Sequence, residues 1–173
     1  MDQAFIELLG LKDLKVPLKK YWPALGPNWD GLATLSDESV ILVEAKANIK
    51  ELASPPCGAE SEASIKQILQ SIADTQKYMG IAGNYARPEL WFNAFYQYAN
   101  RLAHLHFLST LNGVSTHLVF LDIINDPDSG AEAVRSIREW ENLTLLVESC
   151  LGLSPSKRLM KFVHHVHVDV STL

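Results

Sequence analysis

The sequence predicts a single α/β domain in which a small mixed β-sheet is flanked by helices. Apolar runs with the length of buried strands alternate along the chain with longer segments whose apolar residues recur at helical spacing. Such an alternation is typical of domains that pack helices against a sheet. The chain has 173 residues, the usual size of one domain, so residues 1–173 are expected to fold as one unit.

The first third of the chain is predicted to form a helix and then a β-hairpin. Asp2–Leu14 has its apolar residues at helical spacing, whereas Val16–Asn28 is rich in proline and glycine and is predicted to be turns and extended chain. Asp30–Leu35 and Val40–Ala47 have the composition of strands. The polar segment between them, Ser36–Ser39, predicts the turn of a hairpin.

Helices and strands continue to alternate in the rest of the chain. We expect a helix that begins after Ser61 or Ser64, a long helix over Glu89–Leu111 that ends at Asn112-Gly113, a strand over Thr116–Ile124, a helix over Ala131–Cys150 and a final strand over Phe162–Val170. The hairpin must be antiparallel, and the later strands can run parallel to one of its members.

The charge of the chain argues against a general binder of polyanions. Asp and Glu number 20, Lys and Arg number 15, and the net charge is −5. Nucleic acid would therefore have to bind a local basic patch. The candidates are Lys12, Lys15, Lys19 and Lys20 near the start and Lys157, Arg158 and Lys161 near the end; the alternative is that these cations form ordinary solvated faces.

The sequence favours a cytoplasmic protein with no membrane segment. Its first residues lack the basic stretch and apolar core of a secretory signal, and no apolar run is long enough to span a bilayer. Two cysteines, Cys57 and Cys150, cannot build a disulfide framework or a zinc ribbon. The sequence does not fix the oligomeric state, and a homodimer stays open.

Three ionisable residues of the hairpin are the first candidates for chemistry. Glu44 and Lys46 lie two residues apart in an apolar strand, so both project to the same face. A three-residue turn would place Asp30 directly opposite Glu44, where two carboxylates can share one divalent cation. A two-residue turn would instead place Asp30 opposite Ala45 and separate the pair.

This trio suits the hydrolysis of a phosphodiester. Carboxylates that hold Mg²⁺ or Mn²⁺ can neutralise charge on the phosphate and activate a water molecule. A neighbouring lysine can orient that water and stabilise the developing charge. The alternative interpretation is structural, with Lys46 in a salt bridge to Glu44 or Asp30 at the edge of the sheet.

Asp30 followed by Glu44-Ala45-Lys46 in an apolar strand resembles the PD-(D/E)XK nuclease superfamily. The wider string from Trp22-Pro23 to Ala47, together with the segment Tyr96–Leu105, is similar to an uncharacterised bacterial family within that superfamily. The resemblance implies a restriction-endonuclease-like core, a metal-dependent nuclease activity, catalytic roles for the Asp, Glu and Lys residues, and a nucleic-acid substrate.

The sequence departs from the superfamily pattern in two places. Pro27 lies three residues before Asp30, where the name of the superfamily implies an adjacent proline. Many members carry a glutamate on the first helix, and Glu7 is the only candidate for this third metal ligand, although it points away from Phe5 and Leu9. Glu51 and Ser54, just beyond the Glu-x-Lys strand, are further candidates for substrate binding or support.

Polar residues of the long helix form a second constellation. Asn93, Gln97, Asn100, Arg101 and His104 fall on one narrow stripe of a helix that is otherwise almost wholly apolar. We expect Gln97, Asn100 and Arg101 to face the same cleft as Glu44, where they can contact a phosphate or the carboxylates. The alternative is a stripe that faces water.

The last strand offers a third candidate site. His165, His167 and Asp169 alternate onto one face of it, and two imidazoles in this pattern can bind zinc or iron. Three functions therefore follow from the sequence: a metal-dependent nuclease, a catalytically inactive nuclease-like fold that binds a protein or small ligand, and a histidine-based metal site.

Overall fold

A four-stranded mixed sheet, in the order β1-β2-β3-β4, is the centre of the computed structural model, which describes residues 4–83 and 86–173. β1 (Gly31–Thr34) and β2 (Val40–Lys46) form the predicted antiparallel hairpin. β3 (Thr116–Ile124) pairs in parallel with β2, and β4 (Val163–Asp169) pairs in parallel with β3. The predicted α/β class is confirmed, and each strand lies within one or two residues of its expected bounds.

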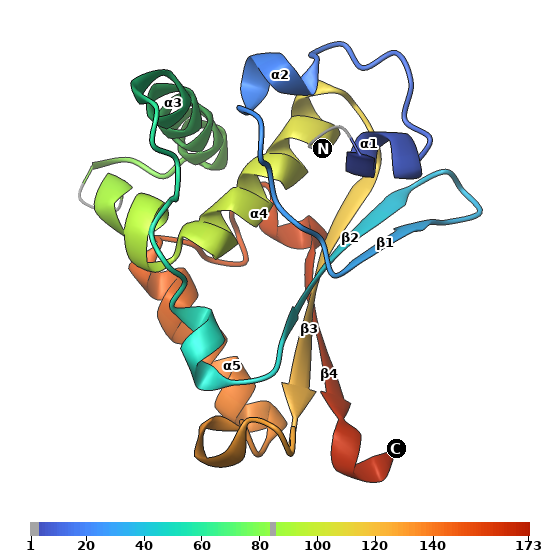
Figure 1. Ribbon diagram of the computed structural model, residues 1–173, viewed down its shortest axis with the longest axis vertical. Helices are drawn as coiled ribbons and strands as arrows, with labels where there is room; N and C mark the ends of the chain where they lie inside the picture. Colours follow the sequence, from blue (N-terminus) through green and yellow to red (C-terminus); the bar gives the residue numbers. More distant parts are fainter. Residues whose placement is uncertain (1–3, 84–85) are drawn as a thin grey trace.

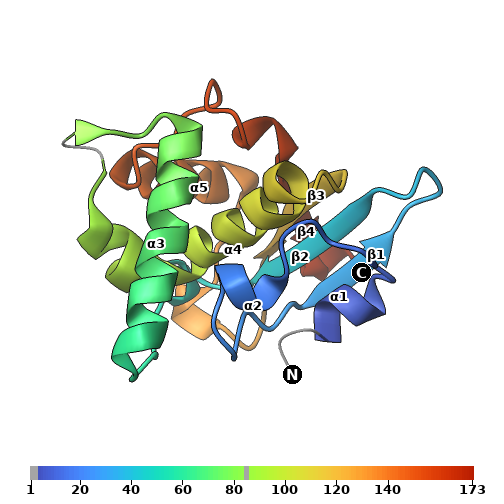
Figure 2. The same ribbon diagram turned by 90° about the horizontal axis from the view of Figure 1, so that it is seen from above.

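The helices lie on one side of the sheet: α4 (Tyr96–His106) packs against it, α5 (Ile137–Cys150) lies beside its lower part, and α3 (Glu62–Met79) packs on the outer side of α4 (Figures 1 and 2). The strand residues that point toward them alternate along each strand and are buried, among them Leu42 and Leu118. The main core lies between these two layers. Glu44 and Lys46 share the face of Leu42, so the candidate catalytic residues lie under the helical layer.

Short helices fill the connections. α1 (Ala4–Leu8) and α2 (Leu18–Tyr21) precede the hairpin, and the short 3₁₀ segments are η1 (Ile49–Leu52), η5 (Gly130–Glu132), η6 (Met160–Phe162) and η7 (Val170–Thr172). The Tyr21 hydroxyl contacts the Thr75 hydroxyl of α3 at 3.0 Å and donates to the Ala103 carbonyl of α4 at 3.0 Å. These two contacts link α2 to both α3 and α4.

The predicted long helix over Glu89–Leu111 is interrupted. Residues Leu90–Ala94 (η3) and Phe107–Leu111 (η4) are π-helical turns on either side of α4, and Phe95 departs from helical geometry with φ −122° and ψ 31°. π turns are frequent at functional sites because they change which side chains face the core. Here the break lets the Ser54 hydroxyl accept from the Gln97 backbone N–H at 3.0 Å.

Two other predicted helices begin or end elsewhere. The helix expected over Asp2–Leu14 ends at Leu8 and is followed by Gly10 in the left-handed region, with φ +68°; Asp2 itself lies outside the described residues. The helix expected from Ala131 begins at Ile137, because the Ser136 side chain caps it by accepting from the Glu139 N–H. The apolar periodicity before Ser136 belongs to a loop.

The hairpin has the three-residue turn that the sequence hypothesis required. The Leu35 N–H donates to the Ser39 carbonyl at 2.8 Å, leaving Ser36, Asp37 and Glu38 as the turn. Glu38 takes the left-handed conformation, φ +65°, that closes such a loop. Asp37 Oδ1 accepts from the Ser39 N–H and hydroxyl, which fixes the turn locally. Gly31 therefore pairs with Val43, where the hairpin ladder ends. The Asp30 backbone N–H donates to the Val43 carbonyl at 3.1 Å, and its side chain reaches the Ala45 N–H, which brings Asp30 beside the strand segment that carries Glu44.

Among the described residues, no helix combines the length and the apolar character needed to cross a bilayer.

A buried histidine gives the fold a pH dependence that can be measured. His106 on α4 is 3% exposed and lies against the ring of Tyr78, with centroids 4.8 Å apart. Burial lowers the pKa of His106, and the Asp74 carboxylate opposes this only in part. The pKa of His106 in the folded protein therefore lies below its value in the unfolded chain, about 6.5. Since the unfolded chain binds the proton more readily, the free energy of unfolding decreases as the pH falls below that value.

We therefore expect His106→Phe, which keeps a ring in place but cannot be protonated, to flatten the loss of stability between pH 7 and pH 5. Urea denaturation of wild type and variant at several pH values measures the difference. Parallel curves for the two proteins over this range would show that His106 does not contribute.

Candidate active site

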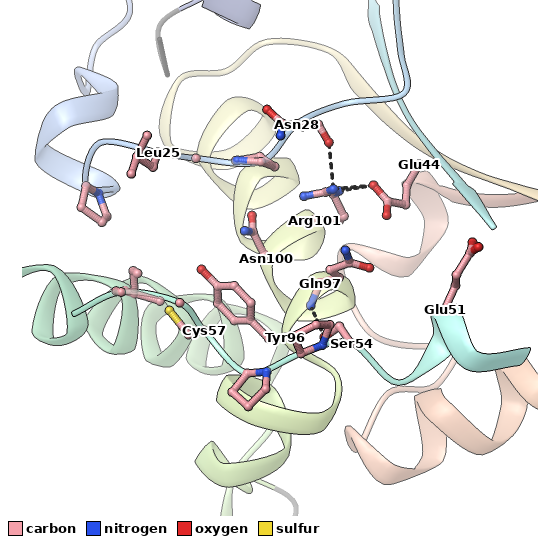
Figure 3. A pocket seen from close by; sticks show the side chains of 18 of the residues that line it. Leu25, Asn28, Glu44, Glu51, Ser54, Cys57, Tyr96, Gln97, Asn100 and Arg101 are labelled. Carbon is pink, nitrogen blue, oxygen red and sulfur yellow. Dashed lines mark hydrogen bonds and ion pairs between the residues drawn. The ribbon is translucent and has the colours of Figure 1, made fainter.

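The candidate residues line one cleft of about 1100 Å³ (Figure 3). The cleft lies between the start of the hairpin, the loop after η1 and the polar side of α4. It gathers residues that the sequence placed far apart: Asp30, Glu44, Lys46, Glu51, Ser54, Gln97, Asn100 and Arg101. The trio shares this cleft with Gln97, Asn100 and Arg101 of the helix stripe. The other two stripe residues do not line it: Asn93 is exposed, and His104 is buried against Phe5 and Trp22.

Glu44 is the centre of the cleft's ion pairs. It is 3% exposed, and each of its carboxylate oxygens is held by a cation. Lys46 Nζ donates to Oε1 at 2.5 Å, while Arg101 Nε donates to Oε2 at 2.6 Å. A buried carboxylate is costly unless it is paired, and here two positive charges offset it.

Arg101 is fixed from several sides. Its guanidinium also donates to the Asn28 carbonyl at 2.9 Å, and it lies over the Trp29 ring, 4.7 Å from the centroid. The residue is 5% exposed. These contacts join α4 to the segment that leads into β1, and Figure 3 shows the guanidinium between Asn28 and Glu44.

Lys46 links the hairpin to α4. Its ammonium donates both to Glu44 and to the Gln97 side-chain oxygen, the latter at 2.9 Å. Gln97 lies one helical turn before Arg101, so the two residues meet neighbouring positions of β2. The sequence prediction that the polar stripe faces Glu44 and not bulk water is supported for both residues.

Asp30 lies at the exposed rim of the cleft. Its Oδ2 accepts from the Ala45 backbone N–H at 2.7 Å, which satisfies a donor that β1 no longer reaches. The side chain thus crosses from the start of β1 to β2 next to Glu44. One oxygen is used in this bond, and the residue faces the same cleft as Glu44 and Lys46.

Glu51 and Ser54 have structural bonds of their own. Glu51 accepts from the Ala47 N–H at 3.0 Å and from the Asn48 side chain at 2.8 Å, as the partner of Asn48 in capping η1. Ser54 is buried and accepts from the Gln97 N–H. Both line the cleft, and both also fix the segments that form its wall.

Tyr96 also lines the cleft, although the sequence interpretation did not single it out. It lies there with Asn100 and Cys57 (Figure 3). Burial, and next the Cys57 contact, raise the pKa of Tyr96 above its ordinary value. The phenol is therefore a hydrogen-bond donor at neutral pH and cannot act as a base there.

Glu7 is not part of this arrangement. It lies on α1 with its side chain exposed, and it is not among the residues that line the cleft. The reason is visible in the helix: Phe5, Ile6 and Leu9 are the buried positions, which turns Glu7 to solvent. The first-helix glutamate that the resemblance suggested as a metal ligand is not brought to the site.

The sequence interpretation did not identify Asp122, a buried aspartate of β3. Asp122, 2% exposed, is the β3 partner of Lys46 in the strand register. Its Oδ2 lies 2.8 Å from His165 Nδ1 and 3.6 Å from His167 Nε2, so the two histidines of β4 converge on it. A lone acid in an otherwise apolar strand was the signal that could have identified it.

The third predicted residue of the β4 face has a different role. Asp169 accepts from the Asn125 side chain and the Ser171 N–H, and thereby caps η7. Within residues 4–83 and 86–173, no group of three or more His, Cys, Asp or Glu side chains is arranged to hold a metal ion. The histidine-based metal site therefore has no support from the geometry.

Comparison with known proteins found no relative of this chain. Family models, curated proteins and solved structures were all searched, and none matches this chain.

The Glu44–Arg101 pair should dominate the stability of the site. Glu44→Gln leaves Arg101 buried without its counter-charge, and we expect it to cost about 3–5 kcal/mol. Asp30→Asn retains an oxygen for the Ala45 N–H, so it should cost less than about 1 kcal/mol. Urea denaturation with both single variants measures the contrast.

The double variant Glu44→Gln/Arg101→Met tests the cause of that loss. Removing both charges should restore part of the stability that Glu44→Gln loses, since Arg101 is no longer an unpaired buried cation and only Lys46, the more exposed of the two, still lacks its carboxylate partner. Additive losses in the double variant would contradict a direct coupling between the two residues.

Proposed function

We propose that this chain is a divalent-metal-dependent phosphodiester hydrolase that acts on nucleic acid. The observation that carries the proposal is the meeting of Asp30, Glu44 and Lys46 in one cleft, in the register that a three-residue turn imposes. The resemblance of these residues to the PD-(D/E)XK nuclease motif supports the same function. Mg²⁺ or Mn²⁺ is the proposed cofactor.

The two carboxylates of the cleft fit Mg²⁺ better than a metal ion that takes all of its ligands from the protein. Mg²⁺ is commonly bound through one or two carboxylates, with water and substrate phosphates as the other ligands. Asp30 and Glu44 supply two carboxylates at one cleft, and Asp30 uses one oxygen for the Ala45 N–H. When bound, the ion would supply charge neutralisation at the phosphate and a more acidic water molecule.

Lys46 and Gln97 are suited to position the attacking water and the phosphate. The Lys46 ammonium is held between the Glu44 carboxylate and the Gln97 amide, so its direction is fixed on a rigid strand. From there it can donate to a phosphate oxygen as negative charge develops. Gln97 and Asn100 add neutral hydrogen-bonding groups to the same wall.

One observation favours a second candidate function, a nuclease-like fold that binds a partner without catalysis. Both oxygens of Glu44 are already engaged by Lys46 and Arg101. A closed network of this kind can serve structure alone. Metal binding at Glu44 requires one of these contacts to loosen, and Lys46, the more exposed of the two cations, is the one better placed to do so.

The first test is thermal melting with and without Mg²⁺ or Mn²⁺. Ligand at 100 times its dissociation constant should stabilise the wild type by about 2.7 kcal/mol. Asp30→Asn should abolish most of that shift, because it removes a charged ligand with little cost to the fold. Asp128→Asn, at an exposed position of the loop after β3, is the matched control and should keep the wild-type shift. A wild type without any metal-dependent shift would favour the non-catalytic module.

The second test concerns hydrolysis. Lys46→Met keeps the apolar stem and removes the ammonium, so we expect metal binding to persist while the cleavage rate falls at least about 100-fold. Cleavage of single- and double-stranded DNA and RNA is followed on gels with wild type, Lys46→Met and Asp128→Asn prepared identically. Full activity in Lys46→Met would show that the activity comes from elsewhere.

A further inference from the structure

We propose that a second cleft, lined by basic residues from the end of the chain, binds the phosphate groups of a nucleic-acid strand. The cleft has a volume of about 730 Å³. It lies where the end of α3, the end of η4 and the start of β3 meet the connection from α5 to β4. None of its lining residues belongs to the cleft that contains Glu44.

The charged residues among the described lining of this second cleft are all basic. Lys157, Arg158 and Lys161 line it, and no Asp or Glu is among the described lining residues. Hydroxyl groups complete the polar surface: Ser109, Thr110, Ser115, Thr116 and Ser156. Ammonium, guanidinium and hydroxyl donors without competing carboxylates are the groups that contact phosphate in nucleic-acid complexes.

A fourth cation comes from the other end of the sequence. A Cβ placed on Gly113, a lining residue, would lie 3.5 Å from Lys15 Nζ. Lys15 is exposed and belongs to the basic segment near the N-terminus. Lys15 of the first basic segment and the three cations of the last one thus lie near the same cleft on a protein whose net charge is −5. A local concentration of positive charge on an acidic chain implies a specific use for an anion there.

The cationic side chains are held in position by their neighbours. Arg158 lies over the Tyr78 ring, 5.4 Å from its centroid, and Lys161 lies over the Phe162 ring at 4.7 Å. Lys157 Nζ donates to the Gly80 carbonyl at 2.9 Å, which joins this connection to the end of α3. Figure 2 shows the two segments at the same end of the molecule.

These contacts favour a nucleic-acid strand over an acidic peptide or a lipid surface. Arg158 and Lys161 are exposed and keep donors for phosphate, while the rings of Tyr78 and Phe162 lie against them and fix their direction. Fixed cations beside hydroxyl donors suit the phosphates that follow one another along the backbone of a strand. Anionic lipid headgroups and the carboxylates of an acidic peptide are also attracted to cations, and the competition experiment below separates them from a strand.

This inference does not require hydrolysis at Glu44. Binding is measured in EDTA, by fluorescence anisotropy of a labelled single-stranded oligonucleotide over a series of salt concentrations. Wild type should bind, and its affinity should fall steeply with salt. No divalent metal is present in this assay, so failure of the proposed hydrolysis and failure of this binding site are distinguishable.

The decisive variant is Arg158→Gln/Lys161→Gln. Because each neutralised phosphate contributes about −0.7 to the log-log salt slope for a single strand, the slope should become shallower by about 1.4. The affinity at low salt should fall roughly ten-fold, and equally for different base sequences. Circular dichroism melting checks that both proteins are folded to the same extent.

Lys66→Gln/Arg138→Gln is the matched control, with the same change in net charge at exposed positions of α3 and α5 outside this cleft. It should keep the wild-type affinity and slope. The proposal is overturned if wild type does not bind in EDTA, if both double variants weaken binding equally, or if poly-glutamate or anionic lipid vesicles compete as well as the oligonucleotide.

Discussion

The buried pair of Glu44 and Arg101 is the interaction on which the arrangement of the site depends. Removing two such charges from water costs several kcal/mol for each ion, so the pair persists only when its remaining hydrogen-bonding groups are satisfied. Lys46, the Asn28 carbonyl and the Trp29 ring supply those partners. The pair therefore fixes the position of α4 along β2. In that position the Gln97 side chain accepts a hydrogen bond from Lys46.

The local part of this geometry was predictable because it depends on few residues. The polar turn limits the hairpin to a small set of registers, and only one of them brings Asp30 to Glu44. The alternation of strand side chains then puts Lys46 on the same face. Helical spacing likewise gathers Gln97 and Arg101 into one stripe, since residues one turn apart share a face. The bounds of β2 and β3 were predictable from their mainly apolar sequences, because such runs are typical of buried strands.

Other parts depend on contacts between distant segments, which periodicity does not reveal. The sequence offered Lys46 and Arg101 as possible partners of Glu44, but nothing local indicates that both bind it at once, or that Asp122 receives the two histidines of β4. The break at Phe95 occurs together with the hydrogen bond from the Gln97 N–H to Ser54, a residue of another segment. The start of α5 is determined by the Ser136 cap. Glu7 had the right residue type for a ligand but lies on the exposed side of α1.

The two clefts differ in how an anionic strand can approach them. The described lining of the Glu44 cleft holds four acids, Asp30, Glu44, Glu51 and Glu60, against the three bases Lys46, Lys50 and Arg101. A phosphate near Asp30 is therefore repelled unless a divalent cation offsets the carboxylates. The second cleft has bases and no acids in its described lining, so it can attract phosphate without metal. The proposed capture of a strand at the second cleft and the proposed entry of its phosphate into the acidic cleft would therefore differ in their metal dependence, because only the acidic cleft needs a cation to accept an anion.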